Sequence, residues 1–370
     1  MAKIKDFIRQ EIVLCIAFLA AAISMIFVPP DMQYKNYFDL RTLALLYCLM
    51  IVVAGMRKAG TFARLAHILC THAGNTRSLG VILVALSFFS AMFITNHVAL
   101  ITFVPFAVVV LGMAHQEKQL IMLVVLQTAA ANLGSILTPV GNPQNIYIQS
   151  FYNLSSADFL RTTFPVWLIS LVLLLLLCLL LPGDALSLFL GESPILHGKK
   201  LCIYLGLFVI CLITVLRILS WWIMLIIVTA VLAVYDIKSL KDADFFLLLT
   251  FVFFFIFSGN LARMDSVDRF LRAILTGHEY GMGLLLSQII SNVPATLLLS
   301  GFTDNAKALL LGVDVGGLGT PIASLASLIS LKLYSHSENA NLGKYLIIFT
   351  IINILMLALL SIPALILLHT

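Results

Sequence analysis

Charged side chains are scarce in this sequence. Only 11% of its 370 residues are Asp, Glu, Lys or Arg, whereas 61% are hydrophobic. A soluble domain keeps about a quarter of its residues charged, because most of its surface faces water. The 22 basic and 17 acidic side chains are too few to cover a soluble globule of this length. The composition therefore predicts an integral membrane protein and argues against a cytosolic enzyme, a secreted scaffold or a nucleic-acid-binding protein.

Residues that carry metal and redox chemistry are also sparse. The six cysteines stand singly in apolar runs, no CxxC pair occurs, and the eight histidines form no cluster. We interpret the cysteines as small buried hydrophobic residues, not as disulfides or metal ligands. No catalytic constellation is visible either. The sequence thus predicts a protein that is not an enzyme and has no cofactor, with sodium as the one metal ion to consider.

Long apolar runs dominate what is present. A membrane-spanning helix needs about 20 apolar residues. Seven uncharged runs of roughly this length predict plain spanning helices, at residues 12–28, 42–56, 164–181, 201–216, 218–235, 245–262 and 345–368.

Four further apolar segments carry polar residues, glycine or proline in their middle. Residues 78–114 and 280–303 contain the polar centres 95–97 and 291–294, which we interpret as the tips of two re-entrant hairpins. Segments 119–149 and 308–331 contain glycine, proline and amide residues, which predict helix breaks near residues 132–145 and 314–324. Non-helical backbone at membrane depth is tolerated only where protein or a water-filled cavity satisfies its polar groups.

These features occur twice in the same order. Each half has an apolar helix, a basic amphipathic stretch expected to lie on the membrane surface, a hairpin with Asn at its tip, a broken helix and a plain helix. Five predicted crossings separate the two starts, so the halves should be inverted repeats. We expect an N-terminal transmembrane helix in residues 1–38, repeat 1 in 39–181, a cytoplasmic linker in 182–200 and repeat 2 in 201–370. Asn96 then pairs with Asn292, and residues 133–135 pair with 318–320.

The distribution of basic residues gives the orientation. With a cytoplasmic N-terminus, the cytoplasmic segments hold 14 of the 22 Lys and Arg residues, and the opposite side holds 8. Cytoplasmic loops of membrane proteins carry such an excess. We therefore expect a multi-pass protein of the cytoplasmic membrane with its N-terminus inside the cell.

Inverted repeats with broken helices are typical of secondary transporters, whose sites lie at the repeat interface. At a helix break, the positive end of one half-helix attracts anions, and the carbonyl end of the other coordinates cations. Asp314 is the acidic residue inside a helix that ends at a break, and it could bind a proton or sodium or serve as a structural brace. His97, beside the first tip, could titrate near neutral pH or make a plain polar contact.

The first break resembles the signature of a known superfamily. Residues 138–145 read Thr-Pro-Val-Gly-Asn-Pro-Gln-Asn and follow Asn-Leu-Gly-Ser at 132–135. This pattern is similar to that of the ion transporter superfamily, which includes divalent anion/sodium symporters, citrate–metal symporters, arsenite-efflux permeases and certain sodium/proton antiporters. The tips of the divalent anion symporters read Ser-Asn-Thr. Both tips of this chain keep the hydroxyl residue and the Asn but lack the final Thr.

The resemblance implies a set of site residues. It implies that cations bind between each tip and the break of the same half. Asp314 is added as a cation ligand because a carboxylate at membrane depth is a functional candidate. The resemblance also implies that substrate lies between the two cation sites, and that the scaffold helices form a homodimer. The cation-binding residues are Thr95, Asn96, Gly134, Ser291, Asn292, Gly319, Ala323 and Asp314; the substrate-binding residues are Asn96, Thr138, Asn142, Asn292 and Thr320.

The sequence therefore predicts an all-α polytopic membrane protein with two inverted repeats, each with a re-entrant hairpin and a discontinuous helix. We expect a secondary active transporter that moves a small anion, a di- or tricarboxylate, coupled to Na⁺ or H⁺ by alternating access. The expected partners are this anion and the lipid bilayer, with no nucleic acid. A Na⁺/H⁺ antiporter with Asp314 as the exchange site, an arsenite or oxyanion efflux permease, and a passive ion channel are the alternatives.

Overall fold

A computed structural model describes residues 11–114, 116–185, 193–338 and 340–369. The described residues form α-helices and short 3-10 turns, with no β-strand among them. Eight helices in these segments are long and apolar enough to cross a membrane. The predicted all-α polytopic fold is thus confirmed. Parts of the predicted N-terminal segment (1–10) and linker (186–192) lie outside the described residues.

The chain elements follow the predicted order. The first half comprises α2 (Ile12–Phe27), η1 (Met32–Tyr37), α3 (Leu40–Lys58), α4 (Thr61–Cys70), α5 (Thr76–Ile94), α6 (Asn96–Met113), η2 (Glu117–Gln119), α7 (Leu120–Gly134), η3 (Ser135–Leu137), η4 (Pro139–Gly141), α8 (Pro143–Phe151) and α9 (Ser156–Cys178). The second half comprises α10 (Gly198–Val215), α11 (Trp221–Tyr235), η5 (Ile237–Lys241), α12 (Phe245–Ala262), α13 (Asp265–Leu275), α14 (Glu279–Ile290), α15 (Asn292–Leu299), η6 (Ser300–Phe302), α16 (Ala306–Val315), η7 (Pro321–Ala323), α17 (Leu325–Ser335) and α18 (Leu342–His369).

The candidate spans differ in how much of their surface other helices cover. The candidate spans are α3, α5, α6, α7 with its flanking turns, α9, α10, α12 and α18. The α7 span is 94% buried, whereas those of α9 and α18 are each 28% buried. Helix α7 is therefore at the centre of the molecule, and α9 and α18 present most of their apolar surface outward. Two predicted spans are shorter than expected, since α2 has 16 residues and α11 has 15.

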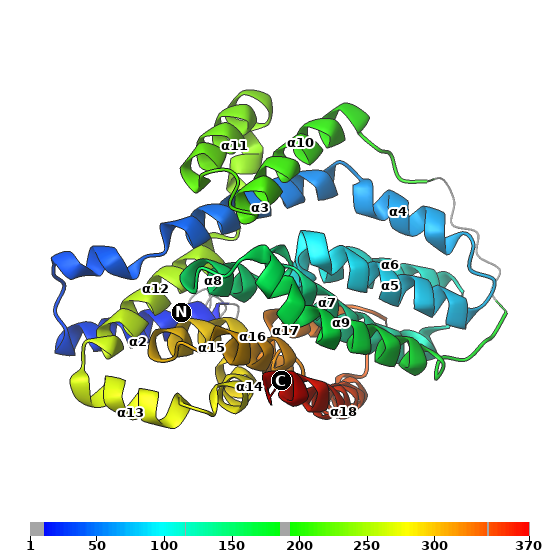
Figure 1. The fold of residues 1–370 in the computed structure, drawn as a ribbon. Coiled ribbons are helices and arrows are strands. Elements are labelled where there is room, and N and C mark those ends of the chain that lie inside the picture. Colours follow the sequence, from blue (N-terminus) through cyan, green and yellow to red (C-terminus); the bar gives the residue numbers. More distant parts are fainter. Residues whose placement is uncertain (1–10, 115, 186–192, 339, 370) are drawn as a thin grey trace, which may run out of the picture.

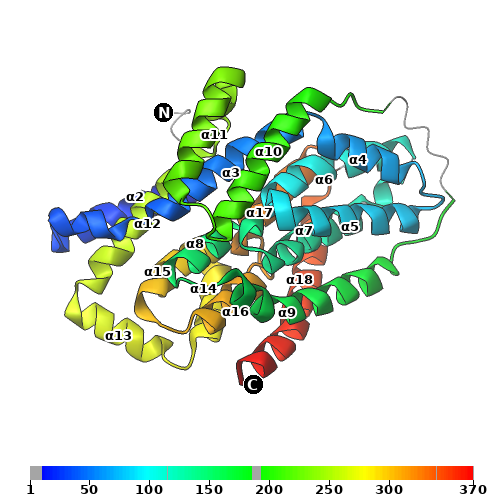
Figure 2. The same cartoon turned by 45° about the horizontal axis from the view of Figure 1, so that its top comes forward.

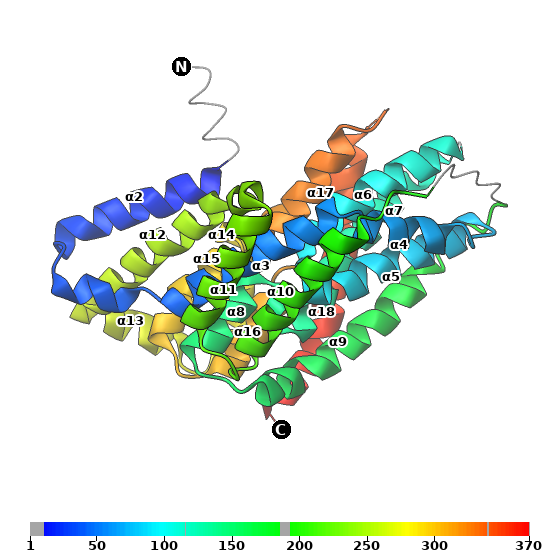
Figure 3. The same ribbon diagram turned by 90° about the horizontal axis from the view of Figure 1, so that it is seen from above.

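Packing divides the helices into a peripheral group and a central group. Helix α2 runs along α12 (Figures 1 and 3), and α3 packs against both α10 and α11, which stand at the top of the molecule in Figure 1. The central group contains α5, α6 and α7 together with α14, α15 and α16. The amphipathic stretches predicted at residues 57–67 and 263–272 correspond to α4 and α13, and α13 lies on the periphery with Leu275 as its buried residue (Figure 2).

The two halves exchange contacts reciprocally. Helix α17, which follows the break in the second half, packs against α6 of the first hairpin. Helix α8, which follows the break in the first half, packs against α15 of the second hairpin. Each hairpin therefore holds the broken helix of the other half, as two related halves would. That the halves cross the membrane in opposite senses stays a prediction.

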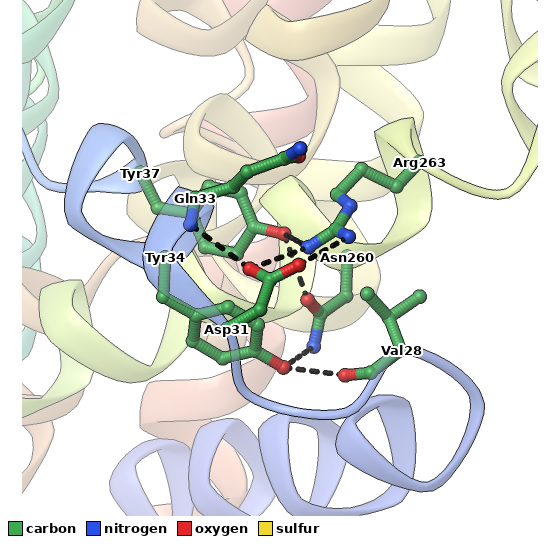
Figure 4. Close-up of polar contacts among 7 residues, drawn as sticks. All are labelled: Val28, Asp31, Gln33, Tyr34, Tyr37, Asn260 and Arg263. Atoms are coloured by element: carbon green, nitrogen blue, oxygen red, sulfur yellow. Dashed lines mark hydrogen bonds and ion pairs between the residues drawn. The ribbon is translucent and has the colours of Figure 1, made fainter.

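A polar network fastens α2 and η1 to the end of α12 (Figure 4). The buried amide of Asn260 is at its centre: Nδ2 donates to Tyr34 Oη at 2.9 Å, and Oδ1 accepts from Tyr37 Oη at 3.1 Å. Arg263 donates to Tyr37 Oη at 3.1 Å and forms a salt bridge of 2.6 Å with Asp31. Because these residues lie more than 200 positions apart, the network closes the N-terminal segment onto the second half.

The Asp31–Arg263 pair should make stability depend on pH. Hydrogen bonding to the Arg263 guanidinium lowers the pKa of the Asp31 carboxyl from its ordinary value. A carboxyl with a lowered folded-state pKa stabilises the fold above its unfolded-state pKa, and this contribution is lost as pH falls through the folded-state value. We therefore expect Asp31→Asn to lower the melting temperature at about pH 7 and to have a smaller effect at about pH 3. Thermal unfolding in detergent, with the exposed Asp265→Asn as control, measures this; an equal decrease at both pH values would contradict it.

Candidate functional site

The two hairpin tips share an unusual backbone conformation. Thr95 has φ 68° and ψ 151°, and Ser291 has φ 78° and ψ 152°. A positive φ is uncommon for residues other than glycine and marks a constrained turn. The residues that follow the turns are buried, with Asn96 2% exposed and Asn292 4% exposed. Both tips therefore lie inside the protein, as a re-entrant hairpin requires, although each arm of the first hairpin is also long enough to cross a membrane.

Each helix break is fastened to its own hairpin at an equivalent position. The hydroxyl of Thr138 donates to the carbonyl of Met92, and the hydroxyl of Thr320 donates to the carbonyl of Gln288 at 3.1 Å. Both acceptors lie three residues before the tip, and both threonines precede a proline. These hydroxyls are thus engaged in positioning the breaks, which is the role that the structure gives these two predicted substrate residues.

Glycine permits a close approach at equivalent positions in the two halves. A Cβ on Gly134 would meet the backbone of Phe88, and a Cβ on Gly316 would meet the backbone of Leu284. Phe88 and Leu284 each lie seven residues before a tip. Together with the threonines, these contacts align Gly134 with Gly316 and Thr138 with Thr320. The sequence-based pairing of residues 133–135 with 318–320 is therefore wrong by three residues.

Asn132 joins the two halves. Its Oδ1 accepts from Asn96 Nδ2 and from Ser324 Oγ, each at 3.0 Å. Its Nδ2 donates to Ser327 Oγ at 3.2 Å and to the carbonyl of Gly317 at 3.4 Å. A single buried amide thus contacts the first tip, the second break and the helix that follows that break. Sequence analysis noted Asn132 in a motif but assigned it no role.

Gly317 brings the second tip to the same centre. A Cβ on Gly317 would lie 3.0 Å from Asn292 Nδ2, so the two residues are in contact. Contacts therefore run from Asn96 to Asn132, from Asn132 to Gly317 and from Gly317 to Asn292. These four residues come from both tips and both breaks. The predicted convergence of Asn96 and Asn292 is found in this geometry.

Asp314 occupies the position equivalent to Asn132. The alignment of Gly134 with Gly316 places Asp314, two residues earlier, opposite Asn132. Asp314 likewise reaches across to the other half, because its Oδ1 accepts from Gln144 Nε2 at 3.3 Å. The side chain is buried, and its Oδ2 has no hydrogen-bond partner. No salt bridge to Asp314 occurs among the described residues.

Other buried oxygens at the first break also lack donors. Asn142 donates from Nδ2 to Ser135 Oγ at 2.5 Å, and Asn145 donates from Nδ2 to the Ser135 carbonyl at 3.4 Å. The Oδ1 atoms of both asparagines have no hydrogen-bond partner. A buried acceptor without a donor is costly and marks a place where a cation, a proton donor or water binds.

The remaining predicted residues lie around the second break. Gly319 has φ 97°, and Ser291 Oγ donates to the carbonyl of Ala323 at 3.4 Å. Gln288 holds this turn, since its Nε2 donates to the carbonyls of Gly316 at 2.7 Å and Leu318 at 3.0 Å. Sequence analysis missed Gln288 and also Gln144, Ser324 and Ser327. An amide inside an apolar run is the signal that could have identified Gln288, and the place of Gln144 within the motif 138–145 is the signal that could have identified Gln144.

His97 lies beside the first tip but outside this network. Its backbone N–H donates to Asn96 Oδ1 at 2.9 Å, and its ring Nε2 has no hydrogen-bond partner. Among the described residues, no group of three His, Cys, Asp or Glu side chains could hold a metal ion.

Comparisons with known proteins agree with this architecture. A family model described as "Citrate transporter" matches residues 7–308. An uncharacterized transporter of Methanocaldococcus jannaschii is 31% identical over 88% of this chain and 89% of its own length. The inner membrane protein YbiR of Escherichia coli is 32% identical over 80% of both chains. A silicon efflux transporter of rice, Oryza sativa, is 27% identical over 50% of this chain and 38% of its own length.

Proposed function

Because this chain belongs to the citrate transporter family, we propose that it is a secondary active transporter that carries a di- or tricarboxylate across the cytoplasmic membrane, coupled to Na⁺ or H⁺. The observation that carries this proposal is the convergence of both tips and both breaks on Asn132 and Gly317. A passive channel does not need two matched sets of tip and break that meet at one centre. Alternating access needs both sets, because each half must open and close the same site.

The helix ends at this centre suit an anion and a cation together. Four helices begin at a tip or a break: α6 at Asn96, α15 at Asn292, α8 at Pro143 and α17 at Leu325. Their N-terminal N–H groups and partial positive charges attract an anion. Four others end there, namely α5, α14, α7 and α16, and offer carbonyl oxygens to a cation. A carboxylate and its coupling ion would therefore bind side by side.

The coupling ion would also replace the positive side chains that the site lacks. Segments 78–117, 119–160, 273–306 and 308–331, which form the tips and breaks, contain no Lys or Arg. An anion bound there needs compensation from helix ends and from co-bound cations. We propose Thr95, Asn96 and Gly134 as ligands of one cation, and Ser291, Asn292, Gly319 and Ala323 as ligands of a second. Asn96, Asn142 and Asn292 would contact the substrate, and Thr138 and Thr320 would hold the breaks around it.

Asp314 is proposed as the group that makes transport depend on the ion. Its counterpart Asn132 cannot ionise and has partners for both side-chain atoms, whereas Asp314 is an acid with one oxygen unpaired among the described residues. A carboxyl group so deeply buried is stable only when it is protonated or when a bound cation neutralises its charge. Binding of a cation or proton at Asp314 would then favour the packing of α16 against Gln144 and Asn145. Ion binding would in this way be coupled to the arrangement of the two halves.

A second candidate function is efflux of an oxyanion or of a neutral hydroxylated acid. The absence of Lys and Arg from the tip and break segments suits a ligand that is recognised by hydrogen bonds to amides and hydroxyls. The similarity to a protein named as a silicon efflux transporter points the same way, over half of this chain.

Flux measurements in proteoliposomes test the proposed function. We expect Asn96→Ala and Asn292→Ala each to reduce ion-driven carboxylate uptake at least ~10-fold, because each removes one tip from the centre. Asn353→Ala is a matched control: Asn353 is buried in α18, but its amide donates within its own helix. Uptake that needs neither a sodium nor a proton gradient would indicate a channel. Sodium-driven proton release without carboxylate would indicate the antiporter, and silicate or arsenite export without carboxylate uptake would favour the second candidate.

A further inference from the structure

A shallow cavity lies where two spanning helices end on the same side of the molecule. Helix α3 begins at Leu40, and α10 ends at Val215. The cavity between them and the start of α11 has a volume of about 280 Å³. Its lining residues are Arg41, Thr214, Arg217, Ile218, Leu219, Ser220, Trp221 and Trp222. It is remote in sequence from both tips and both breaks.

Two guanidinium groups line this cavity without an acidic partner. Neither Arg41 nor Arg217 forms one of the salt bridges found in the described part of the chain. Their positive charges repel each other. Asp39 attracts both from a distance, but its carboxylate accepts hydrogen bonds from the backbone N–H and the hydroxyl of Thr42, at 3.0 and 2.6 Å. The cavity thus carries a local excess of positive charge.

Backbone contacts hold both arginines in place. Arg41 donates from Nη2 to the carbonyls of Thr214 and Val215, at 3.4 and 3.5 Å. Arg217 donates from Nη2 to the carbonyl of Gln149 at 2.8 Å and from Nη1 to Asn153. Arg217 also has φ 65°, a conformation that glycine usually adopts after a helix end. Its bonds to Gln149 and Asn153 hold the guanidinium at the cavity wall in spite of this strained backbone.

The surroundings of the cavity are those of a membrane interface. Two of the three tryptophans of the chain, Trp221 and Trp222, lie on its wall. Trp222 is 53% exposed, and the adjoining Ile218 is 76% exposed. Tryptophan beside exposed aliphatic residues at the end of a span is typical of the headgroup level of a bilayer. Helices α10 and α11 stand at the top of the molecule in Figure 2, outside the central group of helices.

We propose that this cavity binds the phosphate group of an anionic phospholipid, between Arg41 and Arg217. Guanidinium groups bind phosphate oxygens with paired, charge-assisted hydrogen bonds. The tryptophan rings and Ile218 contact the glycerol backbone and the first acyl carbons. The bound lipid joins the start of α3 to the α10–α11 turn and, through Arg217, to the end of α8. This site is independent of the transport centre.

Native mass spectrometry of the detergent-purified protein tests the site, with phosphatidylglycerol and phosphatidylcholine as probes. We expect the wild type to retain one phosphatidylglycerol in preference to phosphatidylcholine. Arg41→Gln and Arg217→Gly should each weaken this binding about tenfold. Glycine suits the positive φ at position 217, so the second variant removes the charge without adding strain. Arg161→Gln and Arg269→Gln change exposed arginines that do not line the cavity and serve as controls.

Each alternative result contradicts the proposal. Equal retention of phosphatidylglycerol by the cavity variants and the wild type would show that lipid binds elsewhere. Binding of inorganic phosphate that the same variants abolish, without any preference for phosphatidylglycerol, would identify an aqueous anion site. An equal decrease in the control variants would show that only overall charge matters.

Discussion

Replacement of Asn132 by Leu is expected to abolish transport and to destabilise the protein. The substitution nearly preserves volume but leaves Asn96, Ser324 and Ser327 without their shared partner. A buried polar group that loses its partner costs about 1–3 kcal/mol. The larger effect is on function, since the link between the first tip and the second break is lost. We expect ion-driven uptake to fall ~100-fold, measured in proteoliposomes at equal protein content.

Two further variants separate transport from folding in this prediction. Asn353→Leu makes the same change at a buried amide of α18 whose Nδ2 donates to the carbonyl of Phe349 in the same helix, and it should retain uptake. Ser327→Ala removes the hydrogen bond that Ser327 Oγ accepts from Asn132 Nδ2, and it should lower uptake about tenfold with little change in melting temperature. Normal uptake by a folded Asn132→Leu protein would show that the two halves communicate by another route.

Replacement of Asp314 by Asn is expected to uncouple transport from its ion. The variant gives the second half the same residue that the first half has at Asn132, and its amide oxygen can still accept from Gln144 Nε2. The protein should therefore fold with unchanged or higher stability. Without the carboxylate, the centre no longer requires a compensating cation or proton. We expect ion-driven accumulation to fall at least ~10-fold, while exchange of substrate across the membrane without a gradient continues.

The measurement compares gradient-driven uptake with counterflow, as a function of sodium concentration and pH. Asp304→Asn is the control, because Asp304 is exposed near the start of α16, away from the break. If Asp314→Asn keeps the ion dependence of the wild type, the carboxylate is only a brace for Gln144. Which external variable loses its effect also identifies the coupling ion as sodium or a proton.

The asymmetry between Asn132 and Asp314 is informative about the two halves. Both residues lie two positions before the glycine of the break, and both reach polar groups of the other half. One is a neutral amide with bonds at both ends, and the other is an acid with an orphan oxygen. The hydrogen-bonding hub Asn132 in one half thus corresponds to the group that we propose as the ion-coupling residue, Asp314, in the other. The two halves repeat the same geometry at this position and differ in the side chain, which is the amide of Asn132 in one and the carboxyl group of Asp314 in the other.

The elements of the fold could be predicted because they depend on local properties of the chain. Apolar runs predicted spanning helices, and polar residues or proline within such runs predicted the turns at Thr95 and Ser291 and the breaks after Gly134 and Val315. Two helices, α2 and α11, are shorter than their apolar runs suggested. Hydrophobic length limits where a helix can end, but capping and neighbouring loops decide where it does.

By itself, the sequence determined that this chain is helical, lies in a membrane and interrupts its helices at four places, because hydrophobicity and backbone preference act over a few residues. Only the tertiary structure decided which of those places meet and in what register. The bonds from Asn132 to Ser324 and from Gln144 to Asp314 join residues 170 or more positions apart. Their partners are selected by the packing of whole helices, through close approaches at Gly134 and Gly316, and not by any local pattern. That is why Gln288 and the role of Asn132 escaped sequence analysis, and why the predicted pairing of the two breaks was three residues out of register.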